Sequence, residues 1–392
     1  MLHEPTIATD ELRPTYLEVD LDQLAANYRV IAAHVAPARV MPILKANAYG
    51  HGLCEVARML ESLGAPYVGV AYLEEGLRLR QHGVRLPVLV MGGILGEQIP
   101  RFLEHDLTLT ASSIDKLRAI DEHAAALGRP ATVHLKIDTG MERIGVHWYS
   151  AEKLLEASLR CRHVRVEGIF THFANADGSD LGHARLQLER FHEVLGFYER
   201  RSLPAPLRHA ASSGAILQLR ESHLDLVRPG VLFYGAGPSA EAPATIPVRQ
   251  ALRWITRVVY FKVVRPGNPV SYGSTWVPSE LTRVVTLPAG YGDGYIRAMS
   301  GQAEVIIHGK RYPVIGRICM DQMMVSIGWD SAHNGDEAVL LGASGDAAIS
   351  IEELAAWGGT IPHEVLTSIN TRVPRVYRGS DAVTRTFGPS GS

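Results

Sequence analysis

Lys45 is the first residue whose type and position suggest chemistry. It directly follows the apolar run 40–44 in the stretch VMPILKANAYGHG, and that run has the length and bulk of a buried strand. Lysine is rarely buried without a partner, and partial desolvation lowers its proton affinity. The neutral amine can then form a Schiff base with a carbonyl compound. The alternative is a strand-end lysine that pairs with a carboxylate.

Two turns further along the chain have the composition of a phosphate site. They are HAASSGA at 209–215 and VRPGVLFYG at 227–235, each at the end of a predicted strand. Backbone N–H groups and hydroxyls such as that of Ser212 suit a phosphate. A Schiff-base lysine and a phosphate cradle together predict pyridoxal 5′-phosphate (PLP) as the cofactor. Taken alone, HAASSGA indicates no more than a helix N-cap.

The sequence gives little reason to expect other cofactors. The His-Glu pairs at 192–193 and 363–364 lack the second histidine of an HExxH site, and the three cysteines form no CxxC pair. GYGDGY at 290–295 does not follow a strand and open a helix, as a dinucleotide fingerprint does. We therefore predict no metal ligands and no dinucleotide site.

The elements that position these groups alternate between short apolar runs and amphipathic stretches. In EVARMLESLG, apolar residues at 56, 59, 60 and 63 follow the period of a helix. Eight strand–helix units over roughly 200 to 250 residues predict a (β/α)8 barrel, with a doubly wound sheet as the main alternative. Both folds place their active sites at the carboxyl ends of the strands, which is where Lys45 stands. The eight runs are 40–44, 67–71, 87–91, 107–109, 132–137, 165–170, 207–210 and 224–227.

After the linker GAGPSAEAPATIP, short alternating strands broken by Gly and Pro replace this pattern. The predicted fold class is α/β, with an N-terminal (β/α)8 TIM-type barrel and a C-terminal β-rich domain. We predict that residues 14–244 form the PLP-binding barrel and residues 245–388 the β-rich domain. Residues 1–13 are expected to pack near the second domain.

Composition indicates an ordinary soluble globular enzyme or binding protein. The chain has 392 residues, of which 46% are hydrophobic and 20% charged, and its net charge is −2. This balance gives no overall attraction to nucleic acid or to a membrane surface, so neither is expected as a partner. Three widely spaced cysteines and a start without a signal-peptide pattern favour a cytoplasmic protein.

Nine motifs in order make the chain resemble the alanine racemase family. The match runs from about residue 14 to residue 380, and its motifs are VMPILKANAYGHG, KIDTGMERIG, THFANAD, HAASSGA, VRPGV, VSYGSTW, AGYGDGY, GRICMDQ and RVPRVY. The resemblance implies an isomerase that interconverts L-alanine and D-alanine with PLP and supplies D-alanine for peptidoglycan. It also implies a homodimer whose active sites are shared, with the second domain reaching the partner's barrel.

The resemblance also implies roles for individual residues. Lys45 binds PLP covalently and acts with Tyr272 as one of two acid/base groups. Arg143 lies near the phenolic oxygen of the cofactor and the substrate carboxylate, and Arg228 meets the pyridine nitrogen with His172 as its neighbour. Met320 contacts the substrate. The implied phosphate contacts are Tyr49, Ser212, Gly230, Val231 and Tyr377. The implied supporting residues are Tyr291, Cys319, Asp321 and Lys136, which some members carry carbamylated.

Physical chemistry agrees with this implied mechanism. Racemisation removes a proton from one face of the α-carbon and returns one to the other, so two bases on opposite faces are suited to it. A guanidinium keeps its proton, so Arg228 at the ring nitrogen would make PLP a mild electron acceptor. A mild acceptor favours prompt return of the proton.

Two positions depart from the family pattern, and other functions stay open. Ala211 stands where the family usually has Asn before the phosphate-binding serine, and Trp276 replaces a smaller or tyrosyl residue. One alternative is a serine racemase, or one of broad specificity, with the same fold. Others are a related PLP-dependent decarboxylase, against which Arg228 speaks, and a non-catalytic PLP-binding protein, which would lack the second domain.

Overall fold

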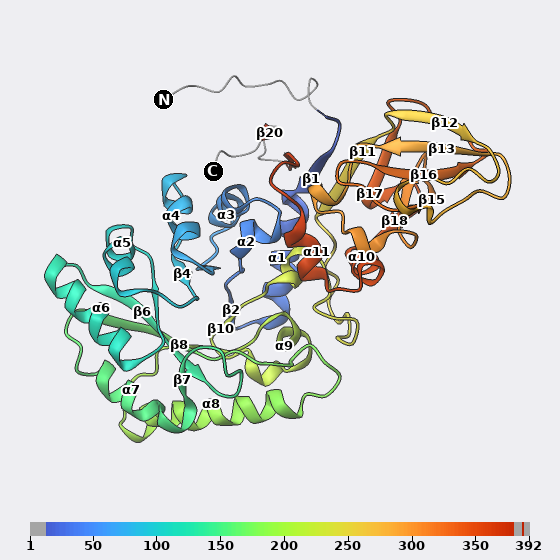
Figure 1. The fold of residues 1–392 in the computed structure, drawn as a ribbon. Helices are drawn as coiled ribbons and strands as arrows, with labels where there is room; N and C mark the ends of the chain where they lie inside the picture. The colour runs from blue at the N-terminus through green and yellow to red at the C-terminus, as the bar shows by residue number, and fades with distance from the viewer. Residues whose placement is uncertain (1–12, 380–385, 388–392) are drawn as a thin grey trace, which may run out of the picture. The chain divides into compact units, whose positions relative to one another are not determined.

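The computed structural model describes residues 13–379 and 386–387, which form two compact units. One unit lies within residues 25–248, and the other combines the residues up to 24 with those from 249 onward. In Figure 1 the barrel unit runs from blue to yellow, and most of the second unit is orange to red. The prediction that the N-terminal residues pack near the second domain concerns, for residues 1–12, a part of the chain outside the described residues.

The first unit is the predicted (β/α)8 barrel. Parallel ladders join β3 to β4, β10 to β2, and β5, β6, β8 and β9 in series. Three further backbone contacts close the ring, namely Ile43 with Gly69, Leu89 with Thr108, and Asp225 N–H with Arg208 C=O at 3.1 Å. The barrel strands are β2 (Arg39–Val40), β3 (Val68–Val70), β4 (Val88–Val90), β5 (Leu109–Ala111), β6 (Ala131–Asp138), β8 (Val164–Phe170), β9 (Leu207–His209) and β10 (Leu226–Val227).

Helices surround these strands, and α6, α7 and α8 lie outside β6 and β8 in Figure 1. Helix α3 buries Val56 and Leu60 of the predicted apolar stripe. Helix α6 begins where the Ser113 hydroxyl accepts the Lys116 N–H at 3.0 Å and ends at the left-handed Gly128. The main helices are α1 (Leu21–Val35), α3 (Leu53–Ser62), α4 (Leu73–Gln81), α5 (Ile99–Glu104), α6 (Ile114–Leu127), α7 (Ala151–Ser158), α8 (Gly182–Arg200) and α9 (Ser213–Gln218).

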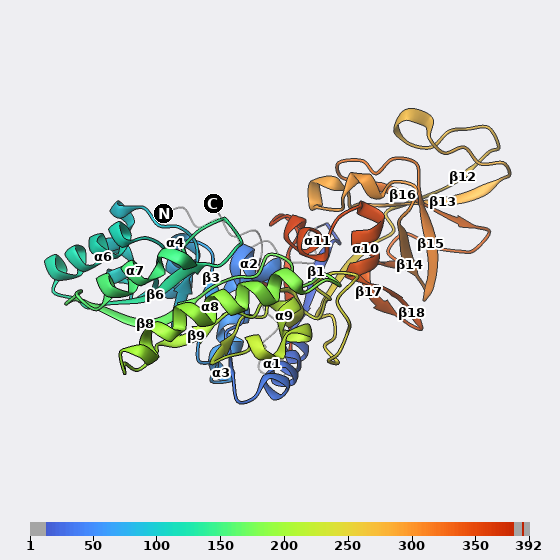
Figure 2. The same ribbon diagram turned by 90° about the horizontal axis from the view of Figure 1, so that it is seen from below.

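The second unit is built on an 11-stranded sheet. Its strand order is β12-β13-β16-β15-β14-β17-β11-β1-β19-β20, with β18 paired to β17. Helices α10 (Ile351–Gly358) and α11 (Pro362–Ser368) lie together beside it, as Figure 2 shows. The strands are β1 (Tyr16–Asp20), β11 (Leu252–Arg257), β12 (Tyr260–Val264), β13 (Thr282–Leu287), β14 (Glu304–Ile307), β15 (Lys310–Ile315), β16 (Met323–Gly328), β17 (Glu337–Ser344), β18 (Ala347–Ile349), β19 (Arg375–Arg378) and β20 (Thr386–Phe387).

Strand β1 corrects the sequence-based assignment of residues 14–24 to the barrel. It pairs antiparallel with β11 and parallel with β19, so it lies inside the second sheet. Its burial fits this position, because Leu17 and Val19 are fully buried on one face. The partner strands lie more than 230 residues away along the chain, a distance over which local pattern carries no pairing information.

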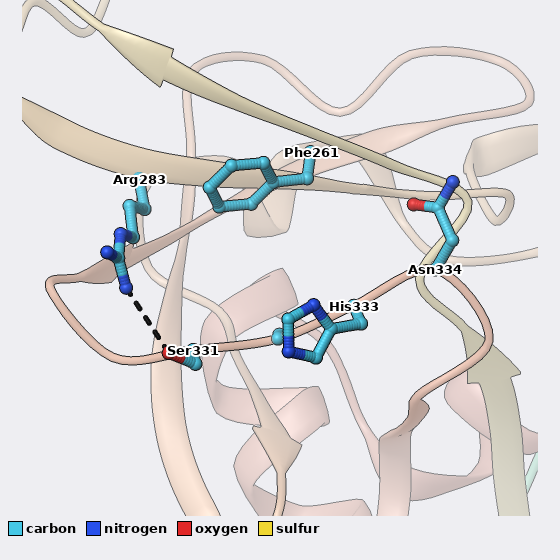
Figure 3. A pocket seen from close by; sticks show the side chains of 6 residues that line it. Phe261, Arg283, Ser331, His333 and Asn334 are labelled. Carbon is cyan, nitrogen blue, oxygen red and sulfur yellow. Dashed lines mark hydrogen bonds between the residues drawn. The ribbon is translucent and has the colours of Figure 1, made fainter.

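The second unit also carries a surface cavity of about 370 Å³. Phe261 and Arg283 face His333 and Asn334 across it, and the Arg283 guanidinium donates to the Ser331 hydroxyl at 3.3 Å (Figure 3). None of the predicted site residues lines this cavity. Among residues 13–379 and 386–387, no helix is long and apolar enough to cross a membrane.

Candidate active site

Lys45 lies at the carboxyl end of β2, as predicted from the apolar run. The backbone continues its barrel pairing up to this point, because Ile43 N–H donates to Pro229 C=O at 3.0 Å and Leu44 N–H to Gly69 C=O at 2.7 Å. The four residues after the lysine, 46–49, then have positive φ angles between 50° and 56°. A left-handed turn without glycine is strained, so the surrounding contacts must hold it in place.

Glu75 supplies several of those contacts. Its carboxylate accepts the backbone N–H of Ala46 at 2.6 Å and that of Ala71 at 2.8 Å. The same side chain therefore connects the lysine turn to the end of β3. Partial burial and the charge of Arg143 lower the pKa of Lys45, while the charge of Glu75 acts in the opposite direction. A lower pKa increases the fraction of free amine available for a Schiff base.

Gly230 and Tyr49 form the centre of the predicted phosphate cradle. A Cβ atom at Gly230 would lie 2.6 Å from the Tyr49 hydroxyl, so the glycine leaves that hydroxyl exposed to the backbone turn. The Tyr49 ring is buried and stacks on Tyr234 with centroids 4.9 Å apart. Tyr234 in turn donates to Ile43 C=O at 2.8 Å, which ties the cradle to the lysine strand.

Ser213 holds the turn that begins at Gly230. Its hydroxyl accepts the backbone N–H of Gly230 at 2.9 Å and that of Leu232 at 3.3 Å. Ser212, the residue predicted from sequence, is the half-buried N-cap of α9, and its side chain makes no capping hydrogen bond. The phosphate contact of Ser212 stays a prediction. Ser213 is a residue that the sequence interpretation missed, and it orders the turn that carries Val231.

Arg228 is a buried guanidinium held entirely by uncharged acceptors. Nη1 donates to His209 Nδ1 at 2.9 Å, and Nη2 donates to the carbonyls of Thr171 and Ala210 at 2.8 Å each. Nη2 also lies 3.2 Å from His172 Nδ1. Burial lowers the pKa of Arg228 to about 9, which still leaves the group charged near neutral pH. His172 thus lies beside the arginine, in the place that the family resemblance implies.

Four positively charged side chains of the barrel act on the pKa of His172. Burial lowers the pKa of this imidazole well below its ordinary value, so it is neutral at physiological pH. Four positive side chains add to the effect, and they are Arg228, Lys136, Arg143 and Lys45, in decreasing order. The barrel mouth therefore concentrates positive charge, which suits a phosphorylated, carboxylate-bearing ligand.

Arg143 is carried by a loop that Asp138 organises. The Asp138 carboxylate accepts four backbone N–H groups, including that of Arg143 at 3.1 Å and that of Gly140 at 2.9 Å. Burial raises the pKa of Asp138, but these donors outweigh burial and lower it overall. Lys136 lies two residues earlier on β6, buried with Nζ 4.8 Å from the centre of the Phe170 ring. Burial lowers the pKa of Lys136 strongly.

Three loops of the second unit bring its predicted residues together. Tyr291 N–H donates to Cys319 C=O at 3.0 Å, and the Ser271 hydroxyl lies 3.6 Å from Cys319 Sγ. Tyr272, Tyr291 and Met320 are 71%, 40% and 53% exposed within the chain. Two tyrosines and a methionine so exposed on joined loops form a surface available to a ligand or a second protein.

Asp321 and Tyr377 also belong to the second unit. Arg372 joins Asp321 at 2.8 Å to the buried Asp293, also at 2.8 Å, and so connects two of the three loops. Tyr377 is buried on β19, where it lies close enough to Arg375 to act on its pKa. Its predicted phosphate contact stays a prediction.

The barrel mouth fits a phosphorylated aldehyde. Lys45 offers a primary amine, the Tyr49 hydroxyl borders Gly230 in a small polar cradle ordered by Ser213, and Arg228 presents a buried cation fixed by His209. PLP needs these three features. The space beside Gly230 that a Cβ would fill is the observation that fits the phosphate end of that cofactor.

Comparisons with known proteins agree with this arrangement. Two protein-family models match, one described as alanine racemase, N-terminal domain, over residues 19–238, and one as alanine racemase, C-terminal domain, over residues 251–377. The chain is 44% identical over 368 residues to an alanine racemase of Carboxydothermus hydrogenoformans, with 93% of this chain and 100% of the relative covered.

Solved structures show the same similarity. An alanine racemase of Clostridium difficile has a TM-score of 0.89 and 33% identity, covering 96% of this chain and 99% of the other. The alanine racemase of a Streptomyces lavendulae that produces D-cycloserine has a TM-score of 0.89 and 37% identity, covering 94% and 98%. A Bacillus anthracis alanine racemase with bound L-Ala-P has a TM-score of 0.89 and 31% identity, covering 96% and 98%.

Proposed function

The chain belongs to the alanine racemase family, and from this premise we propose how its residues interconvert L-alanine and D-alanine. It is a PLP-dependent isomerase, as its relatives and its fold indicate. The observation that carries the residue-level proposal is the barrel mouth, which carries the lysine amine, the cradle at Gly230 and the buried arginine.

In this proposal Lys45 would hold PLP as its covalent anchor, and the bound cofactor would withdraw electrons from the substrate α-carbon. Tyr49, Ser212 and the backbone of Gly230 and Val231 would hold its phosphate. The predicted contact of Tyr377 belongs to the same proposal. Support comes from the Tyr49 hydroxyl, which borders Gly230, and from the Ser213 hydroxyl, which accepts the Gly230 N–H and so orders this turn.

The proton moves between two bases of different chemical type. Lys45 exchanges it on one face of the α-carbon, aided by burial and the charge of Arg143, which lower its pKa. Tyr272 exchanges it on the other face. Arg143 orients the substrate carboxylate through a charge-assisted hydrogen bond. The loop that Asp138 fixes supports this role, because it limits the movement of Arg143.

We further propose a homodimer in which Tyr272, Tyr291 and Met320 serve the partner's barrel, with Cys319 and Asp321 supporting their loops. Their exposure within one chain supports this assignment, because large side chains on a shared surface are suited to being covered on association. Three free cysteines support a reducing compartment, which we propose to be the cytoplasm, where D-alanine would serve peptidoglycan synthesis.

The test is to incubate the holoenzyme with L-alanine in deuterated water and to follow the α-proton by NMR with chiral analysis. Exchange together with D-alanine is expected. Tyr272→Phe should keep the cofactor absorbance and lose nearly all inversion, whereas Tyr260→Phe, at another exposed tyrosine of the same unit, should behave as wild type. Full inversion by Tyr272→Phe would contradict the two-base assignment, and faster turnover of serine than of alanine would favour a serine or broad-specificity racemase.

A further inference from the structure

A chain of buried side chains continues from Arg228 into the barrel interior. His209 Nδ1 accepts from Arg228 at 2.9 Å, and His209 Nε2 lies 2.8 Å from His134 Nδ1. His134 Nε2 lies 3.5 Å from a carboxylate oxygen of Glu167, which also accepts the hydroxyl of Tyr67. Both histidines are fully buried. The mechanism proposed above does not use any residue beyond Arg228.

The packing of the barrel interior leaves room for His134 and His209 and fixes their rings. A Cβ atom at Gly168 would lie 2.5 Å from Nδ1 of His134, so β8 carries a glycine where β6 places the imidazole. The His209 ring stacks on Phe170, with centroids 4.7 Å apart and planes within 6°. Neither ring can therefore turn without displacing a neighbour. The two imidazoles are fixed in orientation as well as in contact.

Chemistry sets the direction of the hydrogen bonds. A guanidinium can only donate, so His209 Nδ1 must accept and its proton lies on Nε2. That proton is donated to His134 Nδ1, which leaves the His134 proton on Nε2, facing the Glu167 carboxylate. Burial lowers the pKa of His209 and of His134, so both stay neutral. Every donor in the chain points away from Arg228 and towards Glu167.

The opposite direction would disrupt the site. If His134 donated to His209, the His209 proton would move to Nδ1 and face the donors of Arg228. A carboxylate at the far end selects against that state, because an anion accepts hydrogen bonds and cannot donate them. The hydrogen bond from His134 is the largest of the effects on the pKa of Glu167 and brings it down to about 2, with further help from Tyr67 and Arg165 against burial. Glu167 thus stays ionised.

We propose that Glu167 is a positioning residue that acts through His134 and His209 to keep Arg228 aimed as a donor at the cofactor ring. This inference rests on the proposed function for the role of Arg228, but the direction of the chain does not. Glu167 lies between Arg165 and Gly168 on β8, away from the carboxyl end that carries the site. It sets the hydrogen-bond state of a residue that it does not touch.

The test is ¹⁵N NMR of the histidine rings in the holoenzyme, with assignment from His134→Gln and His209→Gln. Wild type should show both rings neutral with the proton on Nε2. In Glu167→Gln the amide can donate as well as accept, so a second state with His209 protonated on Nδ1 should appear. The kcat should fall by roughly tenfold, which is the size of the loss when a metal-bound histidine loses its hydrogen-bond partner. Glu189→Gln, at an exposed site on α8, is the matched control.

Each outcome bears on the proposal. Glu167→Asp should restore both the wild-type ring signals and most of kcat, because it returns the carboxylate. A wild-type spectrum with His209 protonated on Nδ1 would overturn the proposal, even if every variant failed to fold. So would Glu167→Gln with a lower Tm but unchanged tautomers and kcat, which would indicate a packing role alone. If the tautomers shift as expected but the wild type does not racemise alanine, the hydrogen-bond chain from Glu167 to Arg228 is confirmed and the proposed function is contradicted.

Discussion

Gly230→Ala should weaken cofactor binding by a calculable amount. The added Cβ would lie 2.6 Å from the Tyr49 hydroxyl, whereas ordinary Cβ contacts begin near 3.4 Å, so the hydroxyl must retreat by about 0.8 Å. The ring has little freedom to do so, because it is buried and stacked on Tyr234. Overpacking of this kind costs about 1–3 kcal/mol. If that cost falls on the bound state, Kd for PLP rises roughly 5- to 150-fold.

The assay is a titration of the cofactor-free variants with PLP, followed by absorbance. Tyr49→Phe removes the atom that the new methyl group would meet and leaves Cζ at 3.3 Å, a contact that a small shift relieves. We therefore expect the double variant to bind PLP about as well as Tyr49→Phe alone. The coupling between the two sites should be about 1–3 kcal/mol, within the range of residues in contact.

Two results would refute this reasoning. A Gly230→Ala variant that binds PLP within twofold of wild type would show that the cradle is not the phosphate site or is softer than its packing indicates. Strictly additive losses in the double variant would show that the Tyr49 hydroxyl is not what the methyl group displaces. Gly96→Ala is the matched control, because an added Cβ there meets nothing within 4 Å and Gly96, like Gly230, has no positive φ.

Three further predictions concern the barrel. Asp138→Asn should loosen the loop that carries Arg143, raising KM for alanine and lowering the unfolding free energy by about 1–3 kcal/mol, as measured by kinetics and denaturant titration. Burial keeps His209 neutral in the folded protein, so below the ordinary histidine pKa near 6.5 the unfolded chain binds more protons than the folded protein. The free energy of unfolding should therefore fall with decreasing pH by up to about 1.4 kcal/mol per pH unit, and His209→Gln should flatten this slope in unfolding curves. Lys136, whose pKa burial lowers, should take up carbon dioxide as a carbamate, visible by NMR with ¹³C-bicarbonate and absent from Lys136→Met.

Each of these has a clear contrary outcome. An unchanged KM in Asp138→Asn would mean that Arg143 does not depend on the loop. A pH slope in His209→Gln as steep as in wild type would assign the acid sensitivity to other groups. A carbamate signal that persists in Lys136→Met would place the modification on another amine.

The sequence predicted the barrel because each strand and helix has a local signature. Short apolar runs between segments of helical period located all eight barrel strands to within a few residues, and Lys45 fell at the carboxyl end of the first. The left-handed turn after Lys45 had no such signature, because Ala46 and Ala48 ordinarily favour right-handed backbone. Contacts such as the hydrogen bond from Ala46 N–H to Glu75, 29 residues further along the chain, hold it in place.

The parts of the site that sequence could not predict depend on which side chains meet inside the barrel. His134, Glu167 and His209 stand on three different strands, and each alone reads as one more polar residue in a buried run. The hydrogen bond by which Ser213 orders the Gly230 turn likewise depends on the direction in which its hydroxyl points. Strand register and turn geometry determine these contacts, and the periodicity of residue types predicts neither of the two.

The pairing of β1 has a consequence for how this protein is made. Tyr16–Asp20 leaves the ribosome before the barrel, yet its neighbours β11 and β19 follow only after the whole barrel has been synthesised. Until then it is an unpaired apolar strand, the kind of segment that invites aggregation and chaperone binding. A fragment that begins at residue 249 would lack a strand from the middle of its sheet, leaving two exposed edges. A synthetic peptide spanning residues 13–24 should rescue the solubility of that fragment by filling the gap.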